Sequence, residues 1–549
     1  MAELSEQPSD PSGRFPTDPT GLAPAAPPSV VRLAHGDRLE LRIAPVSKRI
    51  GDHVVRMLAY NGSIPGPVLH VDEGSEITVE VRNDGDTEAT VHWHGLRLEN
   101  RYDGVPHETQ APIPVGGTFG YRIQFPDPGF YWYHPHVRED YDLEMGLYGT
   151  IMVEPANPSY WPPADRQLSI TLDDLLMEDG HIAPFDPSGP TFTAMGRFGN
   201  VMLTNGETTF SQQAAVGEVV RLYLVNTANT RIFNVGIPGA HMKLVGGDSG
   251  RYERETFADE VLLAPSERAV VDVLFATAGE VHLEHRPPGG DVYTLGTFSV
   301  EGTAAGDAAR AFDTLRTDAA LTAEHEALAH HLERPPDKVL AFSSLMPLLY
   351  GDAEATADSY ACPMHPEVTA TTPETCPKCG MKLVPSQAAS TSHHAEAHPA
   401  GGHGHHSDDG IEWEDLMPDI NRQTDATNMI WKVIDRQTGD ENAAINWSFA
   451  VGDRVKIRLV NEMEGSEHPM HHPFHIHGAG RFLVLSRQGV PETNLVWKDT
   501  VLVPAGHTVD ILLDVSNPGR WMAHCHIAEH NQSGMMFSFD VARTAPSPM

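Results

Sequence analysis

Short runs of alternating apolar and polar residues recur along most of the chain. Glycine, proline, asparagine and aspartate separate these runs, as they do in turns between strands. A period of two places every second side chain on one face of a sheet. The pattern therefore predicts an all-β fold built from packed β-sandwiches. The clearest runs are 38–43, 76–82, 167–172, 219–225, 269–275, 454–460, 482–486 and 508–515.

The length of 549 residues predicts several domains, because a single hydrophobic core rarely grows that large. Helical periodicity is scarce, and the main exception, 313–332, is expected to be a helical linker. The predicted boundaries are a disordered polar tail at 1–29, a first domain at 30–157, a second at 158–305, a linker at 306–335 and a third domain at 336–549.

Residues 356–408 break the β pattern and are expected to interrupt the third domain. They contain three of the four cysteines and then a histidine-rich run with glycine and alanine, which is typical of a flexible tether. The run 338–343 before them has the pattern of a strand. We therefore place this insert inside the third domain and not between two domains.

Charge and composition exclude some function classes. The net charge of −37 argues against nucleic-acid binding, which needs basic residues against phosphate. No apolar run is long enough to span a bilayer. The first residues lack the pattern of a secretory signal, which predicts a cytoplasmic location. If a signal was removed before this sequence begins, the protein is instead exported.

Histidines, and not cysteines, carry the chemical signal. Three of the four cysteines lie close together and the fourth is alone, which is no disulfide framework. Residues i and i+2 of a strand point to the same side, so each His-x-His pair can offer two imidazoles to one cavity. Four such pairs predict a metal site, and imidazole suits copper, zinc, iron and nickel. The pairs are His92/His94, His134/His136, His475/His477 and His524/His526.

The last pair narrows the choice of metal to copper. Cys525 lies between His524 and His526, so on a strand it faces the opposite side. His530 and Met535 follow it closely. Two histidines, a thiolate and a weakly bound methionine are the ligands of a blue-copper site. The alternative, a buried free thiol, does not explain the histidine and methionine spacing.

These motifs resemble those of the multicopper oxidases. The matching segments are His92-Trp93-His94-Gly95, His134-Pro135-His136, His472-Pro473-Phe474-His475-Ile476-His477-Gly478, and His524-Cys525-His526 through Met535. The resemblance covers most of the chain and implies three cupredoxin-like Greek-key domains. It implies four copper ions, one of type 1, one of type 2 and a type 3 pair, between the first and last domains. The middle domain has no such motif and is expected to be a spacer.

The resemblance also assigns the copper ligands by motif position. The implied type 1 ligands are His472, Cys525, His530 and Met535; the type 2 ligands are His92 and His475; the type 3 ligands are His94, His134, His136, His477, His524 and His526.

Catalytic protons need an acid near these coppers. Asp103 resembles the family's acid beside the trinuclear site, although an Asp-Gly turn explains it equally well. Bacterial relatives often have a second acid after the last type 1 histidine. Asn531 stands there in this chain and cannot carry a proton in the same way, and the nearby Glu529 has a different phase.

The implied activity is that of a laccase, in which one-electron oxidation of phenols or aromatic amines reduces dioxygen to water. The alternative reductant is a metal ion, Cu(I) or Fe(II). Residues before His472 could bind Cu(I), but methionine is also a common packing residue. A copper storage or chaperone protein and a copper nitrite reductase are weaker alternatives, since neither needs all three kinds of copper site. The oligomeric state stays open. The Cu(I) candidates are Met463, Glu464, Glu467, His468, Met470 and His471.

The insert resembles a small heavy-metal-binding module. Cys-x-x-Cys with further soft donors suits Cu(I) or zinc, and the zinc alternative is purely structural. The histidine tract behind it either buffers copper or is a solvated linker. The candidate ligands are Cys362, His365, Cys376, Cys379 and Met381.

Overall fold

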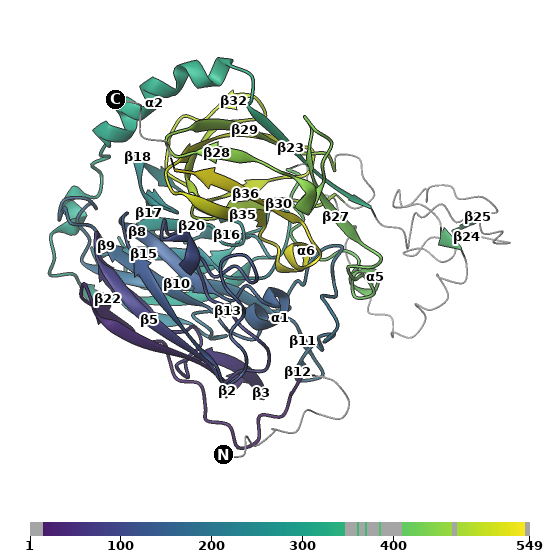
Figure 1. Cartoon of the computed structure of the whole chain (residues 1–549). Coiled ribbons are helices and arrows are strands. Elements are labelled where there is room, and N and C mark those ends of the chain that lie inside the picture. The colour runs from purple at the N-terminus through teal and green to yellow at the C-terminus, as the bar shows by residue number, and fades with distance from the viewer. Residues whose placement is uncertain are drawn as a thin grey trace.

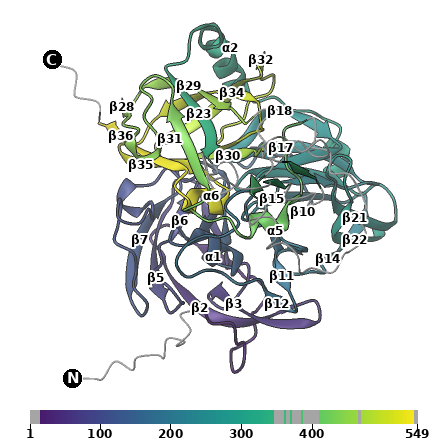
Figure 2. The same ribbon diagram turned by 90° about the vertical axis from the view of Figure 1, so that its right-hand side faces the viewer.

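The computed structural model describes residues 15–345, 360–361, 368–370, 384–385, 409–463 and 469–543. Within them, strands dominate and helices are few, which confirms the all-β prediction. Six large sheets stack in three pairs, seen as three lobes in Figure 1 and Figure 2. In each pair, one hydrophobic core contains side chains from both sheets.

The first pair shows why the alternating pattern forms sheets. In β5, Ile77, Val79 and Val81 are buried and the residues between them are more exposed, as an amphipathic strand requires. One sheet orders β3 (His53–Tyr60), β2 (Arg38–Ile50), β5 (Glu76–Asn83) and β7 (Thr118–Gln124). The other orders β1 (Val30–Leu33), β4 (Val68–Asp72), β9 (Gly149–Glu154), β8 (Gly129–His134) and β6 (His92–His94).

The second pair follows the same plan with longer sheets. One sheet orders β13 (Val201–Thr204), β10 (Arg166–Leu175), β15 (Val219–Asn226), β20 (Arg268–Leu274), β17 (His241–Gly247) and β18 (Gly250–Ala258). The other orders β14 (Ser211–Val216), β22 (Tyr293–Thr303), β21 (Gly279–His285), β16 (Phe233–Gly236) and β19 (Glu260–Leu263). The strands β11 (Met177–Glu178) and β12 (His181–Ile182) form a separate hairpin.

The third pair repeats the plan again. One sheet orders β27 (Ile430–Asp435), β23 (Lys338–Leu345), β29 (Arg454–Asn461), β34 (Thr508–Val515), β31 (Gly480–Arg487) and β32 (Val490–Pro491). The other orders β28 (Ser448–Ala450), β36 (Met536–Ala542), β35 (Gly519–Cys525), β30 (His472–Ile476) and β33 (Thr500–Val503). Each pair has one sheet in which a strand pairs with one neighbour in parallel and with the other antiparallel. The parallel pairings are β2–β5, β10–β15 and β23–β29, and the antiparallel ones are β5–β7, β15–β20 and β29–β34.

The remaining elements are short. The predicted helical linker contains α2 (Ala319–Glu333), where Asp318 caps the first turn by accepting hydrogen bonds from two backbone N–H groups. The other helical elements are α1 (Glu139–Glu144), α5 (Pro418–Asn421), α6 (Ala528–Gln532) and the 3-10 turns η1 (Asn100–Tyr102), η2 (Ala308–Ala311) and η4 (Asn442–Ala444). In the insert, β24 (Tyr360–Ala361) pairs with β25 (Thr369–Ala370) and β26 (Val384–Pro385).

The lobes are packed against one another through apolar contacts. Every residue of β15 is buried, because its second face packs on the first pair of sheets. Tyr223 and Val225 of β15 share this cluster with Phe130 and Trp132 of β8. In Figure 2, α1 and α6 lie where the lobes meet, and the two helices are in contact. This junction positions the candidate site.

The N-terminal segment differs from the prediction of a disordered tail at 1–29. Within its described part, Pro24 bridges to Ser47 and Ala26 to Ser63. The ring of Phe15 stacks on Tyr141 at a centroid distance of 3.8 Å. Composition missed this order because backbone pairing with a distant strand leaves no local pattern. The other domain boundaries stay a prediction.

No helix in the described residues is long and apolar enough to cross a membrane.

Candidate metal centre

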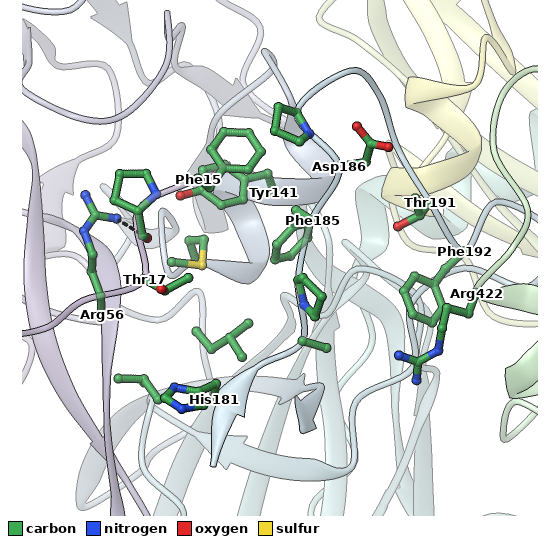
Figure 3. Close-up of a pocket in the computed structure, with 17 residues that line it drawn as sticks. Phe15, Thr17, Arg56, Tyr141, His181, Phe185, Asp186, Thr191, Phe192 and Arg422 are labelled. Atoms are coloured by element: carbon green, nitrogen blue, oxygen red, sulfur yellow. Dashed lines mark hydrogen bonds between the residues drawn. The ribbon is translucent and has the colours of Figure 1, made fainter. Parts of the chain in front are cut away.

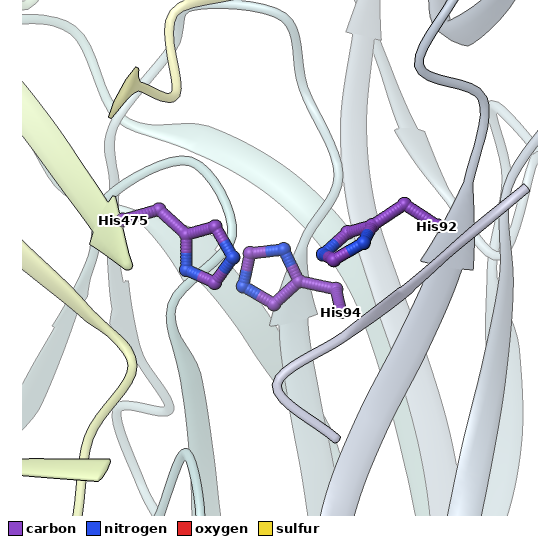
Figure 4. A group of neighbouring side chains, drawn as sticks. All are labelled: His92, His94 and His475. Carbon is purple, nitrogen blue, oxygen red and sulfur yellow. The ribbon is translucent and has the colours of Figure 1, made fainter. Parts of the chain in front are cut away.

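Strand register brings the histidine pairs together. In the first lobe, His92 of β6 lies opposite His134 of β8. In the third lobe, His475 of β30 lies opposite His524 of β35. The histidine faces of the two lobes meet: the rings of His94 and His475 stack at 3.8 Å. Figure 4 shows His92 and His94 from one lobe facing His475 from the other.

The imidazoles form groups with metal-binding geometry. Within each group, one potential ligand atom per residue lies within 4.8 Å of the others. Two groups contain three histidines from both lobes, and a third joins the first and third histidine motifs. These groups are His94, His134 and His526; His136, His477 and His524; and His92, His94 and His475.

The chemistry of these groups fits copper. All are buried, and burial holds the pKa of His94, His134 and His526 well below the usual value, so the rings are neutral and offer a lone pair. Buried polar atoms normally have hydrogen-bond partners. Six ring nitrogens here have none among the described residues, so their lone pairs are available to bind a metal. They are His92 Nε2, His94 Nδ1, His134 Nε2, His136 Nε2, His475 Nε2 and His526 Nε2.

Cys525 faces the other side of its strand, as the alternation predicts. Its Sγ lies 3.5 Å from His472 Nδ1 and 3.7 Å from His530 Nδ1. The side chain of Met535 is fully buried in the same core. Burial raises the pKa of the Cys525 thiol, so the thiolate form needs a bound cation to stabilise it.

Family models match the segments that carry these residues. Models of the multicopper oxidase family match residues 44–158 and 416–545. The chain belongs to the multicopper oxidases. It is therefore a copper-dependent oxidoreductase that uses dioxygen as its acceptor. A model described as a heavy metal binding domain matches residues 359–386 inside the insert.

Relatives agree with this family over most of the oxidase. Multicopper oxidase MmcO of Mycobacterium tuberculosis is 27% identical over 525 residues, covering 90% of this chain and 85% of its own. Laccase-15 of Oryza sativa subsp. japonica is 26% identical over 543 residues, covering 89% and 88%. The solved structure of a multicopper oxidase from Campylobacter jejuni, a metallo-oxidase, has a TM-score of 0.64 at 20% identity, and the match covers 95% of this chain and 98% of that one. It shows the cupredoxin-like sandwich fold.

Asp103 lies beside the oxidase's histidine cluster and contacts two of its rings. Its Oδ2 is 2.8 Å from His477 Nδ1, and its backbone carbonyl accepts a hydrogen bond from His92 Nδ1 at 2.7 Å. It also makes a tight turn: Gly104 has φ +84°, and a Cβ there would lie 2.1 Å from the carbonyl oxygen of Val91. The side chain of Asp103 therefore contacts candidate ligands. The turn accounts for the glycine at 104 but not for the carboxylate at 103.

Two acids at the cluster were not predicted. Glu139 of α1 is fully buried, with Oε1 3.2 Å from His134 Nδ1 and Oε2 accepting from Asn531 Nδ2 at 2.7 Å. Its position three residues after His136 was the available signal. Asp499 has Oδ1 3.0 Å from His94 Nε2, and nothing local in the sequence marks it.

Glu529 points away from the cluster, as its phase predicted. Its carboxylate accepts hydrogen bonds from Asn229 Nδ2 at 3.1 Å and Thr230 Oγ1 at 3.2 Å, both from the middle lobe. Burial raises its pKa to about 8. The middle lobe is thus more than a spacer, because Arg268 of β20 also contacts Asp499 beside the cluster.

The remaining candidates are divided between the core and undescribed segments. Met463 and Met470 are buried in the core of the third lobe, which favours a packing role. His471 is fully buried, and its Nδ1 accepts a hydrogen bond from the backbone of Glu412. Glu464, Glu467, His468 and the insert candidates Cys362, His365, Cys376, Cys379 and Met381 lie outside the described residues.

Two cavities differ in their relation to the cluster. A cavity of about 760 Å³ is lined by Phe15, Tyr141 and Phe185 (Figure 3), and none of its lining residues is a candidate copper ligand. A smaller cavity, of about 410 Å³, lies between the first and third lobes. Its lining includes His136 and Asn531, so it reaches the histidine cluster.

Proposed function

We propose that the oxidase holds four coppers in two places, a type 1 site and a trinuclear cluster. The ligand groups support this division, because the Cys525 group is separate from the histidine groups. The type 1 ligands are His472, Cys525, His530 and Met535; the type 2 ligands are His92 and His475; one type 3 copper binds His94, His134 and His526, and the other binds His136, His477 and His524.

Copper in these sites supplies one-electron steps that together reduce dioxygen to two waters with four electrons and four protons. Cys525 connects the two places: its side chain faces His472 and His530, and its chain neighbours face the cluster. Asp103 holds the Nδ1 side of His477, which turns Nε2 of that ring inward. It stays our candidate for the acid that serves the cluster. The 410 Å³ cavity beside His136 gives dioxygen room to approach.

One observation carries this proposal: a single thiol lies against two imidazoles while its two sequence neighbours belong to a separate histidine cluster. The test is spectroscopy of the copper-loaded protein together with oxygen uptake. We expect a strong blue absorption, a near-ultraviolet type 3 shoulder and oxygen consumption with a reductant. A protein that binds copper without consuming oxygen would instead be a storage or chaperone protein.

For the reductant, we propose laccase-like oxidation of phenols and aromatic amines. The similarity to a named laccase along nearly the whole chain supports this activity. The electron enters at the type 1 site, so the substrate must approach His472 or His530.

A second candidate, oxidation of Cu(I) or Fe(II), is favoured by the burial of that entrance. His472 and His530 are both fully buried, and their outward Nε2 atoms have no hydrogen-bond partner among the described residues. The ring of Trp431 lies 4.0 Å from His530, and its Nε1 donates to the carbonyl of Thr193 in the middle lobe at 2.6 Å. A covered entrance admits a small reductant more easily than a bulky phenol.

The two stretches of chain that flank the insert, here called its stems, also favour a metal substrate. The first stem is the end of β23, where the ring of Phe342 lies 5.5 Å from His472. The second stem includes Glu412, whose backbone N–H donates to His471, the neighbour of His472. Residues 359–386 match a heavy metal binding domain, so a metal-binding segment stands in the chain between two stretches that contact His472 or its neighbour His471. We propose that this segment binds Cu(I), with zinc as the alternative.

The two reductants are distinguished by oxygen uptake from the same copper-loaded sample with a phenol, Cu(I) and Fe(II) in turn. Turnover with the phenol at least equal to that with the metal ions supports the laccase activity. Turnover with Cu(I) alone supports the second candidate. The cytoplasmic location stays a prediction.

A further inference from the structure

Arg268 belongs to the middle lobe, which contains none of the candidate copper ligands. It lies at the start of β20, and its side chain is fully buried. Its side chain makes five hydrogen bonds. Three go to the backbone carbonyls of Phe130, Ser266 and Asp248, and two go to the carboxylate of Asp499 at 2.7 and 2.5 Å. A planar guanidinium paired with both oxygens fixes the plane of a carboxylate more firmly than a single contact can.

The fixed carboxylate faces a candidate ligand of the trinuclear cluster. Oδ1 of Asp499 lies 3.0 Å from His94 Nε2, and it also accepts a hydrogen bond from Thr500 Oγ1 at 3.0 Å. An ionised carboxylate only accepts hydrogen bonds, so Nε2 of His94 must carry the ring proton. The lone pair of that ring is then on Nδ1, the nitrogen without a partner that lies in the cluster.

Asp499 also determines which nitrogen of the neighbouring ring, that of His475, carries the proton, and there it is the opposite nitrogen. The backbone carbonyl of Asp499 lies 2.9 Å from His475 Nδ1, which must therefore carry the proton and leave the lone pair on Nε2. The rings of His94 and His475 stack at 3.8 Å with an interplanar angle of 20°. Two stacked imidazoles thus present different nitrogens, each selected by a different oxygen of Asp499.

The first lobe makes room for this pair of charged residues. Gly95 follows His94 directly and has φ +84°. A Cβ at Gly95 would lie 2.5 Å from Asp499 Oδ2 and 2.7 Å from Arg268 Nη2. The glycine of the first histidine motif is therefore required by the ion pair that packs against it. All three lobes meet here, at Gly95, Arg268 and Asp499.

We propose that Arg268 is a positioning residue of the middle lobe, which acts through Asp499 to direct Nδ1 of His94 into the trinuclear cluster. This inference rests on the ligand roles proposed above. If Arg268 has this role, copper affinity at the cluster depends on how the middle lobe packs against the other two, although that lobe contributes no proposed ligand. The type 1 site is outside its reach, since neither residue contacts His472, Cys525 or His530.

The test is copper titration against a competing chelator, with the near-ultraviolet type 3 band as readout for the cluster and the blue band as internal reference. The variants are Arg268→Gln and Asp499→Asn, with Arg268→Lys as the conservative form. Arg221→Gln is the matched control: Arg221 is an equally buried arginine of the same lobe that pairs with both oxygens of Asp272 at 2.7 and 2.9 Å.

We expect Arg268→Gln and Asp499→Asn to need about 10–100-fold more free copper for half of the near-ultraviolet band, the usual effect of losing a partner of a ligating histidine. The midpoint of the blue band should stay unchanged, and Arg268→Lys should recover part of the loss. The inference is overturned if the near-ultraviolet midpoint of both variants equals that of Arg221→Gln.

Failure to fold would remove the blue band as well. The decision then falls to Asp499→Asn, which keeps the size of the side chain and one acceptor for Arg268. An unchanged near-ultraviolet midpoint in that variant also overturns the inference. A copper-loaded wild-type protein with neither band would refute the ligand assignment itself, before any variant is compared.

Discussion

Removal of copper is expected to lower the stability of the oxidase strongly. Six buried imidazole nitrogens of the cluster have no partner among the described residues. A buried polar group without a partner costs about 1–3 kcal/mol, so these six place on the order of 6–18 kcal/mol on the metal-free folded state. The cost falls on the contact between the first and third lobes, because each proposed type 3 group takes histidines from both.

The assay is calorimetry of copper-loaded protein and of protein stripped with a chelator. For a lobe of roughly 150–250 residues, each kcal/mol lost from the free energy of unfolding lowers the melting temperature by about 2–4 °C. Even the lower limit of about 6 kcal/mol therefore predicts a melting temperature lower by about 10 °C or more. Several lobes need not unfold together, and the first transition is therefore the one to compare. Cys525→Ser serves as the control: it lacks the proposed type 1 ligand but keeps the histidine cluster, and should retain most of the stabilisation by copper.

Equal midpoints within about 2 °C, with metal analysis confirming that the cluster copper is gone, would refute this reasoning. The unpartnered nitrogens would then be satisfied in another way, and they would no longer support a metal centre by themselves.

Three further predictions follow from single features. Cys525→Ser should abolish the blue absorption and oxygen uptake together, and oxygen reduction retained in that variant would contradict the proposed connection through Cys525. Deletion of 356–408 should leave phenol oxidation largely intact and weaken copper loading or tolerance, whereas loss of all activity in a fully copper-loaded deletion would make the insert part of the catalytic fold. Gly104→Ala should destabilise the oxidase more than Gly116→Ala in thermal melts: both glycines have φ above +80°, but only at Gly104 would a Cβ meet backbone, the carbonyl of Val91 at 2.1 Å. Equal losses in the two variants would count against the steric argument.

The sequence was sufficient for features that depend on local periodicity. Alternation with a period of two predicted strands, and the same rule predicted that Cys525 and its neighbours face opposite sides. The structure has this arrangement, with Cys525 Sγ 3.5 Å from His472 and His524 grouped with His136 and His477. When a motif lies within one strand, the spacing of its residues is enough to predict which side of the strand each side chain faces.

The residues that support the ligands could not be predicted in this way. Asp499 contacts His94, which is 405 positions away, and Arg268 reaches Asp499 from a lobe with no histidine motif. Such contacts arise only when the lobes pack, and a buried arginine has no periodic signature in the sequence. The order of residues 15–29 was missed for the same reason, because Pro24 and Ala26 pair with Ser47 and Ser63 and not with local neighbours.

The side-chain amide of Asn531 suits its surroundings because it donates a hydrogen bond to a buried carboxylate. The family resemblance leads one to expect an acid after the last type 1 histidine, and the chain has Asn531. Its Nδ2 donates to Glu139 Oε2 at 2.7 Å, and the other oxygen of Glu139 lies 3.2 Å from His134 Nδ1. A carboxylate at 531 would set two negative charges at hydrogen-bond distance in a buried place, where like charges disfavour one another strongly. Because the first lobe already supplies the carboxylate, the third lobe supplies the donor that orients it.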